Sequence, residues 1–295
     1  MKTRHKLSGS TDLPVLHDAV TVLAKQTRHE RLLGAPVLRL RPWHGLALGA
    51  FTLLWSVALM AQDVGEADQL STLRALLGWI PLLFQGFLLN IVISVMAMAI
   101  GTGLGTLLGI MQIAQLAALR GLAWSVTQFF RNSPWLVLLF FCMFLLPFEF
   151  EIGDMRLPFP DWIKAVIGLS LPVMANVSEI VRGAIQSIPS GQWEASNSLA
   201  FNRKQILTLV ILPQCIKRML PPWMNLYAIL TMATVLASVV GVAEVMTLTQ
   251  RALAAEGRPE LLISFYGFVM LMFFIYCYPI ARYTQKLELR YAVKI

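Results

Sequence analysis

Four ionisable side chains lie inside long apolar runs of the sequence: Arg131, Glu179, Arg182 and Glu244. A charge in such a run is costly unless it meets a partner or faces a cavity. Two roles therefore fit these residues: a buried brace between helices, or the polar lining of a solute pathway. Arg131 and Glu179 lie at the same depth, roughly 13 Å from the same end of their runs, so we expect them to pair. Glu179 and Arg182 are also i, i+3 neighbours, so an ion pair within one helix competes.

Hydroxyl and amide groups in the same runs offer hydrogen bonds to a zwitterion, and they are Asn176, Ser178, Thr231, Thr234 and Ser238. Ser and Thr in a helix also bond to carbonyls of their own helix, so both readings stay open. The four His residues all lie near the N-terminus, and the three Cys share no CxxC spacing. Without an intramembrane His pair or metal-ligand spacing, we predict no catalytic site, no metal site and no enzyme.

A polar stretch separates two apolar runs at residues 183–214, GAIQSIPSGQWEASNSLAFNRKQILTLVILPQ. Pro189 with the following Ser-Gly predicts a turn, and a short helix is expected from Gln192 to Leu199. A tip follows, in which Leu199 and Phe201 are predicted to be exposed unless a partner covers them. The stretch therefore predicts a structured element outside the membrane.

A second short helix is expected after this tip. Asn202 is a suitable N-cap, and Ile206, Leu209 and Val210 share one apolar face. Pro213 is expected to end or kink that helix. Two interpretations remain: the element lies against its own bundle or the headgroups, or it docks a cytoplasmic partner through an apolar centre with a charged rim.

Membrane-spanning helices must position all of these residues. The chain is 57% hydrophobic and 14% charged, whereas a soluble domain is about 25% charged. The apolar runs are continuous rather than alternating, which excludes a β-barrel. We predict an all-α membrane protein with about six spans, at 43–61, 81–111, 122–147, 165–188, 222–249 and 263–281.

The distribution of Lys and Arg predicts the orientation of these spans. With the N-terminus inside, the cytoplasmic segments are 1–42, 112–121, 189–221 and 282–295. They hold seventeen Lys and Arg residues against five in the outer segments, so both termini are predicted to be cytoplasmic. The run 43–61 is then an uncleaved signal anchor. The net charge of +8 matches anionic membrane lipid as a partner rather than nucleic acid.

The polar stretch also carries a recognisable spacing. Its Glu194-Ala195-Ser196, then Ala200, then Val210-Ile211-Leu212-Pro213 resemble the EAA loop of binding-protein-dependent ABC importer permeases, which reads EAA, three residues, Gly, nine residues, Ile-x-Leu-Pro. The spacing matches throughout, and the residues depart at Ser196, Ala200 and Val210. Ala200 matters most, because the family turn favours a residue that adopts positive φ easily.

Longer segments narrow the resemblance to the permeases for histidine, glutamine, glutamate, arginine and opines. NVSEIVRGAIQSIPSGQWEAS (176–196), RNSPWLVLLFF (131–141), LPPWMNLYAIL (220–230) and ASVVGVAEV (237–245) look like segments of that group. A Lys-Asp-Thr-Ser segment usual between the last two is replaced by TMATVL (231–236). The resemblance covers roughly 80–285. It implies a five-span core with an additional N-terminal span (43–61), a basic N-terminal tail (1–42) and a cytoplasmic C-terminal tail (286–295).

The resemblance implies a division of labour among subunits. The loop within 189–221 would be a coupling helix that sits on an ATP-binding subunit, and its residues are Gly191, Glu194, Ala195, Ser196, Leu199, Ala200, Phe201, Leu212 and Pro213. ATP and Mg would bind to a dimer of that subunit, and this chain would hold no cofactor. A second permease subunit and an extracytoplasmic solute-binding protein would complete an amino acid importer in the bacterial cytoplasmic (inner) membrane.

Other motifs agree with that division. The sequence has no GxxxxGK[ST], so it lacks that route to nucleotide binding. Gly101, Gly105 and Gly109 follow at i, i+4, i+8, which predicts close helix packing rather than a dinucleotide site. Two alternatives remain: an importer permease for another small polar solute, and a membrane docking or signalling partner that does not transport.

Overall fold

The computed structural model describes residues 66–152 and 155–291. Most of this chain is helical, because a helix satisfies its own backbone N–H and C=O groups where water is absent. The elements in chain order are α3 (Glu66–Met111), α4 (Ala117–Asn132), α5 (Trp135–Leu145), β1 (Glu149–Ile152), β2 (Met155–Pro158), α6 (Asp161–Gln186), α7 (Ser190–Ser198), α8 (Arg203–Gln205), the π-helical η1 (Ile206–Ile211), α9 (Leu212–Ala233), the 3₁₀ helix η2 (Thr234–Ser238), α10 (Val245–Glu256), the 3₁₀ helix η3 (Pro259–Leu261) and α11 (Leu262–Tyr291).

Four continuous helical stretches are long and apolar enough to cross a membrane, and they are Ser71–Met111, Asp161–Gln186, Arg203–Ser238 and Pro259–Tyr291. A fifth is added if the bent pair α4 and α5 counts as one span. The prediction of a helical, multi-span membrane protein is therefore confirmed for the described residues. The predicted tail (1–42) and first span (43–61) lie outside them.

The predicted span 122–147 is wrong as a single straight helix. α4 ends at Asn132, α5 begins at Trp135, and the two helices are bent by 103°. The residue before a proline is pushed out of the helical region, and Ser133 accordingly has φ −80° and ψ 137°. Pro134 is also extended and precedes the first turn of α5. The Ser-Pro step therefore divides this span.

The predicted span 222–249 is wrong at its C-terminal end. The helical stretch that contains α9 ends at Ser238, and α10 begins only at Val245. Between them Gly241 has φ +91°, a conformation that a glycine adopts without steric cost. Glu244 has an extended backbone and caps α10 with its side chain. α10 is therefore a separate helix.

The remaining predicted spans have the right helices with different ends. The span 165–188 corresponds to α6, whereas α3 begins well before 81–111 and contains Pro81 within the helix. α11 continues to Tyr291, beyond the predicted 263–281. Apolar runs mark the part of a helix that suits lipid, and polar turns at its ends extend the helix past that part.

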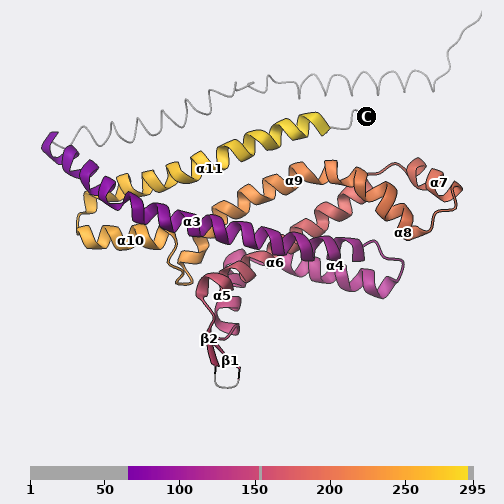
Figure 1. Ribbon diagram of the computed structural model, residues 1–295, viewed down its shortest axis with the longest axis horizontal. Helices are drawn as coiled ribbons and strands as arrows, with labels where there is room; N and C mark the ends of the chain where they lie inside the picture. The colour runs from indigo at the N-terminus through magenta and orange to yellow at the C-terminus, as the bar shows by residue number, and fades with distance from the viewer. Residues whose placement is uncertain (1–65, 153–154, 292–295) are drawn as a thin grey trace, which may run out of the picture. The chain divides into compact units, whose positions relative to one another are not determined.

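A short β-hairpin follows α5, and the sequence patterns did not predict it. β1 and β2 are antiparallel, with Glu149 opposite Pro158 and Ile152 opposite Met155. In Figure 1 the hairpin points away from the long helices, while α7 and α8 lie at one end of the helical bundle and α10 lies at the other. The element with the EAA-like spacing is thus far from the hairpin.

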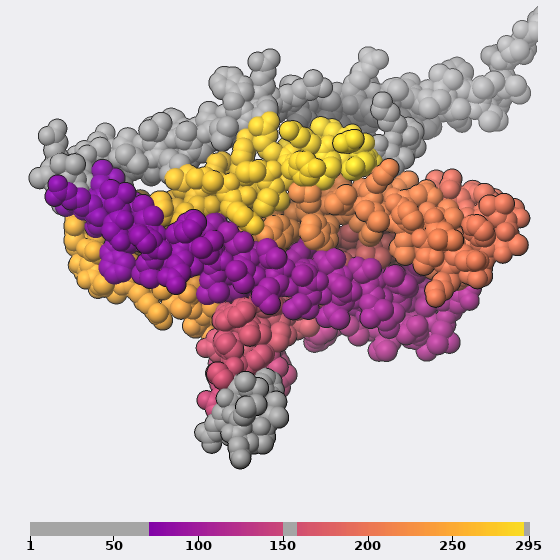
Figure 2. Space-filling model, viewed as in Figure 1, coloured from indigo at the N-terminus to yellow at the C-terminus, as the bar shows by residue number. Residues whose placement is uncertain are grey.

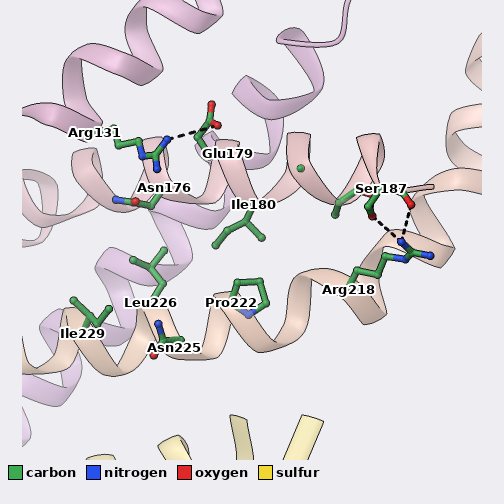
Figure 3. Close-up of a pocket in the computed structure, with 12 residues that line it drawn as sticks. Arg131, Asn176, Glu179, Ile180, Ser187, Arg218, Pro222, Asn225, Leu226 and Ile229 are labelled. Carbon is green, nitrogen blue, oxygen red and sulfur yellow. Dashed lines mark hydrogen bonds and ion pairs between the residues drawn. The ribbon is translucent and has the colours of Figure 1, made fainter. Parts of the chain in front are cut away.

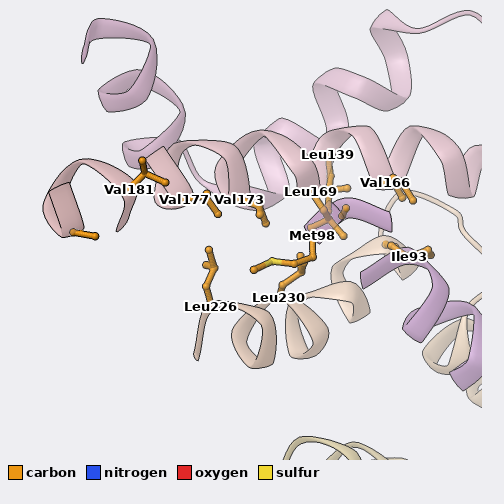
Figure 4. Packing of buried hydrophobic residues seen from close by; sticks show 14 of the residues in the cluster. Ile93, Met98, Leu139, Val166, Leu169, Val173, Val177, Val181, Leu226 and Leu230 are labelled. Carbon is orange, nitrogen blue, oxygen red and sulfur yellow. The ribbon is translucent and has the colours of Figure 1, made fainter. Parts of the chain in front are cut away.

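The main core forms where α3, α6 and α9 pack together. Figure 4 shows Val173 and Val177 of α6 pointing toward Leu226 and Leu230 of α9, with Met98 of α3 beside Leu230. In the space-filling view of Figure 2, α3 crosses the visible face as one continuous band. The core therefore joins α3 to α6 and α9, the two helices between which the cavity described below lies.

Close contact between α3 and α6 depends on the glycines predicted to pack. A Cβ at Gly105 would lie 2.6 Å from the carbonyl oxygen of Met174, and one at Gly109 would lie 2.7 Å from that of Ser178. Gly101 similarly packs on Val173. Small residues let helix backbones approach in a membrane, so the interpretation of these glycines as packing residues is confirmed.

Candidate functional site

The EAA-like segment folds into the predicted short helix and turn. α7 spans Ser190–Ser198, close to the predicted bounds, and follows Pro189. Gly191, Glu194 and Ala195 are exposed on it, whereas Ser196 is buried and donates a hydrogen bond of 2.7 Å to the Gln192 carbonyl oxygen. One side of α7 is therefore turned toward the bundle and the other side is free.

The end of α7 is closed by a Schellman turn centred on Ala200. Phe201 N–H donates to the Ser196 carbonyl oxygen at 3.3 Å, and Ala200 N–H donates to that of Asn197 at 2.9 Å. Ala200 has φ +58° and is the only non-glycine residue with positive φ in the part of the chain that the structure describes. The left-handed conformation costs a residue with a Cβ about 1–2 kcal/mol. This chain thus forms a left-handed turn at the position where the EAA pattern has glycine, although the residue here is alanine.

Replacing Ala200 with glycine is expected to stabilise this turn by about 1 kcal/mol, because glycine adopts positive φ without a Cβ clash. Hydrogen exchange of the purified protein, followed by mass spectrometry on peptides covering α7, should slow roughly fivefold. Ala195→Gly is the matched control, because it places glycine inside the same helix and should speed exchange instead. Faster exchange in Ala200→Gly would contradict the inference that the positive φ of Ala200 destabilises this turn.

The tip after α7 is only partly exposed. Leu199 is 68% exposed, as expected for a residue available to a partner. Phe201 was predicted to be exposed as well, but it is half-buried and packs on the main core. The Schellman turn explains this difference, because its hydrogen bonds direct the residue after Ala200 back toward the helix. The exposed apolar group of this tip is therefore Leu199.

The predicted second helix is present but continues much further. Asn202 and Gln205 form a reciprocal capping box at the start of α8. Pro213 was expected to end or kink this helix, and it does not end it, because the helix continues through η1 into α9. Proline lacks an N–H, and Pro213 lies in the first turn of α9, directly after a π-helical segment whose last bond runs from Leu212 N–H to the Leu207 carbonyl oxygen. Leu212 is half-buried against the core, whereas Pro213 is exposed.

A cavity of about 520 Å³, lined by both polar and apolar side chains, lies between α6 and α9, with a contribution from α4. Figure 3 shows the Arg131 and Glu179 pair at one end of it, and Arg218 bonded to Ser187 at the other. Its polar lining residues are Arg131, Asn176, Glu179, Ser187, Arg218 and Asn225. Arg218 Nη1 donates to the Ser187 carbonyl oxygen at 2.7 Å and to Ser187 Oγ at 2.9 Å. The size of this cavity, and the few polar groups on its mainly apolar wall, suit a small polar solute.

Glu179 forms both of the ion pairs that the sequence left in competition. Arg131 Nη1 lies 3.7 Å from Glu179 Oε2. Within α6, Arg182 Nε donates a hydrogen bond of 3.3 Å to Glu179 Oε1, and Arg182 Nη2 donates to Oε2. The Arg131 side chain is 46% exposed, compared with 14% for Glu179. Glu179 is therefore held mainly by Arg182, and the Arg131 guanidinium remains accessible from the cavity.

The other predicted pathway residues fall into separate groups. Asn176 lines the cavity, and its amide donates to the Pro172 carbonyl oxygen at 2.8 Å. Ser178 instead lies in a buried cluster with Gln112 and Thr127, in which the Gln112 amide donates to both hydroxyls. Thr231 and Ser238 are away from this cavity, and their hydroxyls donate to the carbonyl oxygens four and three residues before them. These positions fit a structural role better than a solute contact.

Thr234 and Glu244 belong to a second buried cluster, which is centred on Asn90 of α3. The Asn90 amide nitrogen donates to Thr234 Oγ1 and to Glu244 Oε2, both at 2.9 Å. Asn90 Oδ1 accepts a hydrogen bond from Val245 N–H at 3.1 Å. The side chains of Asn90, Thr234 and Glu244 are all fully buried. The cluster fixes the start of α10 against α3, which matches the buried-brace interpretation for Glu244.

Several of these residues were not singled out from the sequence. Arg218 was counted only as a loop cation, and its role in the cavity appears because α9 continues through the predicted loop. Asn90, Gln112 and Asn225 are lone amides in or beside apolar runs. An amide within an apolar run is costly unless it is bonded, so this isolation was the available signal for Asn90.

The amino-acid sequence of this chain is similar to those of known proteins. Residues 101–285 match the family model described as binding-protein-dependent transport system inner membrane component. The probable amino-acid ABC transporter permease protein YckA of Bacillus subtilis is 34% identical over 72% of this chain and 90% of its own length. The inner membrane amino-acid ABC transporter permease protein YhdY of Escherichia coli is 30% identical over 70% of this chain, and the chain spans 55% of that relative.

A solved structure agrees on the fold. The crystal structure described as an amino acid ABC transporter with histidines has a TM-score of 0.62, with 22% identity over 77% of this chain and 99% of that chain. At this identity the likeness concerns the fold alone. The helices between α3 and α11 therefore follow an arrangement that is known from a solved membrane protein.

Proposed function

Because the chain belongs to the family of binding-protein-dependent transport system inner membrane components, we propose that it is the transmembrane permease subunit of an ATP-driven importer. The observation that carries the proposal is the EAA-like element. α7 and its turn expose Glu194 and the apolar side chain of Leu199 at one end of the bundle. An exposed apolar residue beside charged neighbours is a suitable centre for a protein contact.

The partners follow from this role. An ATP-binding subunit, present as a dimer with ATP and Mg, docks on α7 and supplies the energy. A second permease subunit, of the same or a different chain, completes the pathway, and an extracytoplasmic solute-binding protein delivers the solute. Closure of the ATPase dimer moves α7 and thereby tilts the rigid spans attached to it, which opens one side of the pathway as the other closes. The chain itself acts as a pore subunit and not as an enzyme.

A polar amino acid is the proposed solute. The relatives that match this chain are named as amino-acid permeases, and the cavity offers charged and amide groups that suit a zwitterion. Another small polar solute is the alternative within the same class. A docking or signalling protein without transport is the alternative from a different class, and it would need α7 but not the cavity.

The proposed orientation of the spans in the membrane follows from the distribution of Lys and Arg along the chain. The end of the bundle with α7 faces the cytoplasm, and the end with α10 faces outward, in the bacterial cytoplasmic (inner) membrane. The segment 43–61 adds a sixth span before the five-span core, with the basic tail (1–42) inside and the end of the chain from 286 onward in the cytoplasm. Anionic inner-leaflet lipid, and not nucleic acid, is the partner of the basic segments.

The cavity assignment is tested by replacing Arg131 with glutamine in the full transporter. Uptake of a labelled amino acid is expected to show a KM roughly fivefold higher, because a half-exposed cation contact is worth about 1 kcal/mol or less. The amount of folded protein should stay the same, because Glu179 keeps its bond to Arg182. Arg251→Gln is the control, since Arg251 is exposed and has no side-chain partner among the described residues. An unchanged KM in Arg131→Gln would remove Arg131 from the pathway.

The function itself is tested by uptake in cells that lack this chain. A panel of labelled acidic, amide and basic amino acids is supplied, and uptake is compared with and without the restored gene and after ATP depletion. Restored, ATP-dependent uptake of at least one amino acid is the expected result. Uptake that never depends on the chain, with docking to a cytoplasmic partner preserved, would favour the docking protein without transport.

A further inference from the structure

Arg203, the first residue of α8, contacts the turn that follows α3, which is distant in the sequence. Its Nη2 donates a hydrogen bond of 2.9 Å to the carbonyl oxygen of Ile113. Ile113 lies just beyond Met111, the last residue of α3. Carbonyl oxygens at the C-terminal end of a helix find no N–H donor within the helix, and they carry partial negative charge. A guanidinium at this point therefore satisfies one carbonyl and complements the end of α3.

The connection from α7 to this arginine is short and held by hydrogen bonds. Phe201 N–H is bonded to the Ser196 carbonyl oxygen, which closes the turn. Gln205 N–H donates to Asn202 Oδ1, and Asn202 N–H donates to Gln205 Oε1, both at 2.9 Å. Each residue between α7 and α8 is thus part of a turn or a cap. Displacement of α7 moves α8 with it, because no loose linker separates them.

The receiving helix is packed so that it transmits this displacement. α3 contacts α6 through Gly105 and Gly109, where a Cβ would meet backbone oxygen atoms at less than 3 Å. Helices packed this closely move together rather than slide freely. A pull on the end of α3 is therefore passed to α6, which forms one wall of the cavity.

We propose that Arg203 is a positioning residue that transmits movement of the coupling helix α7 to α3, and through α3 to the cavity wall. This inference rests on the proposed function, in which α7 receives the ATPase. Without the guanidinium, α7 still binds its partner through Glu194 and Leu199, but its movement reaches only the chain segments covalently joined to it. ATP hydrolysis then continues with less transport.

The neighbouring Lys204 provides a matched control. It is exposed and cationic, and its side chain has no partner in the part of the chain that the structure describes. Three variants of the full chain, Arg203→Ala, Arg203→Lys and Lys204→Ala, are reconstituted with their co-purified partners in liposomes. The ATPase rate, the uptake of the transported amino acid and the amount of bound ATPase are measured for each.

Arg203→Ala is expected to lower the number of solute molecules transported per ATP at least fivefold, with ATPase binding unchanged and its rate within twofold of the wild type. Arg203→Lys is expected to transport more solute per ATP than Arg203→Ala, because an ammonium can still donate to the Ile113 carbonyl oxygen. Lys204→Ala should behave as the wild type. Should Arg203→Ala fail to accumulate, Arg203→Met keeps a long side chain without an N–H donor, and it should lower the number of solute molecules transported per ATP in the same way.

An unchanged ratio in Arg203→Ala would overturn the proposal, and so would an equal fall in Lys204→Ala. Loss of uptake and ATPase rate in the same proportion would also overturn it, because Arg203 would then only stabilise the fold. These outcomes differ from failure of the proposed function, in which the wild-type chain itself binds no ATPase and supports no uptake.

Discussion

Replacing Gly105 with leucine is expected to abolish the folded protein. A Cβ at this position would lie 2.6 Å from the Met174 carbonyl oxygen and 2.7 Å from Val177 Cβ, so α3 and α6 must separate to admit a side chain. Overpacking of a core typically costs about 1–3 kcal/mol, and a clash with backbone gives the upper part of that range or more. We expect the variant to be degraded or to aggregate, as measured by the monodisperse fraction after detergent extraction and size-exclusion chromatography.

Gly103→Leu is the matched control for this variant. It lies two residues away on the same helix, and a Cβ there would meet nothing within 4 Å. Leucine at this exposed position of an apolar helix should be tolerated. Equal amounts of folded protein from the two variants would show that α3 and α6 are not packed as described.

Changing exposed residues of α7, the proposed docking helix, and of the tip that follows it is expected to abolish transport without unfolding the protein. Leu199→Asp places a charge at the centre of the proposed contact, and Glu194→Lys reverses the charge beside it. Removing a central contact residue commonly costs a protein interface 2 kcal/mol or more, which is at least about a thirtyfold loss of affinity. Uptake should fall to background, and the ATPase should be lost on purification while the permease still inserts.

Leu289→Asp is the control for the chemistry of this change. Leu289 is 83% exposed near the end of α11, so the same substitution is made at an exposed leucine of another helix. Uptake and ATPase binding should survive in this variant. Normal uptake by Leu199→Asp and Glu194→Lys would mean that α7 is not the docking element.

The sequence alone predicted the features that depend on local residue type. The apolar runs located α3, α6, α9 and α11, and the spacing of Glu194, Ala200 and Pro213 located the α7 element. The family resemblance drawn from these residues is confirmed by the family match. The sequence did not predict the conformation of Ala200, because the turn favours a residue that adopts positive φ easily; the structure gives it φ +58°.

The errors occurred where backbone geometry outweighs apolar composition. Ser133-Pro134 and Gly241 lie within runs that are apolar on average, so a prediction based on hydropathy continued the helix through both. Pro213 was expected to end or kink a helix, and the helix continues past it. Proline removes one hydrogen bond, and a π-helical segment accommodates that loss when the surrounding helix is packed.

The polar residues were only partly assigned for a different reason. The pairing of Arg131 with Glu179 was predicted because both residues lie at the same distance from the ends of their apolar runs. That distance can be counted along the sequence. Whether Ser178 or Thr234 faces a cavity depends on the rotation of each helix against its neighbours, which a single sequence does not supply. Asn90, Gln112 and Arg218 acquire their roles through partners more than 30 residues away along the chain.

The central claim is that α7 docks an ATP-binding subunit, and site-specific crosslinking from Leu199 tests it most directly. A photoreactive amino acid is placed at Leu199 in the tagged full chain, and a second sample carries it at Leu289. After irradiation of native membranes, the tagged chain is purified and its crosslinked partner is identified by mass spectrometry. Capture of an ATP-binding ABC subunit from Leu199 but not from Leu289 is the predicted result. Capture of lipid or of the chain's own helices alone from Leu199 would contradict the account.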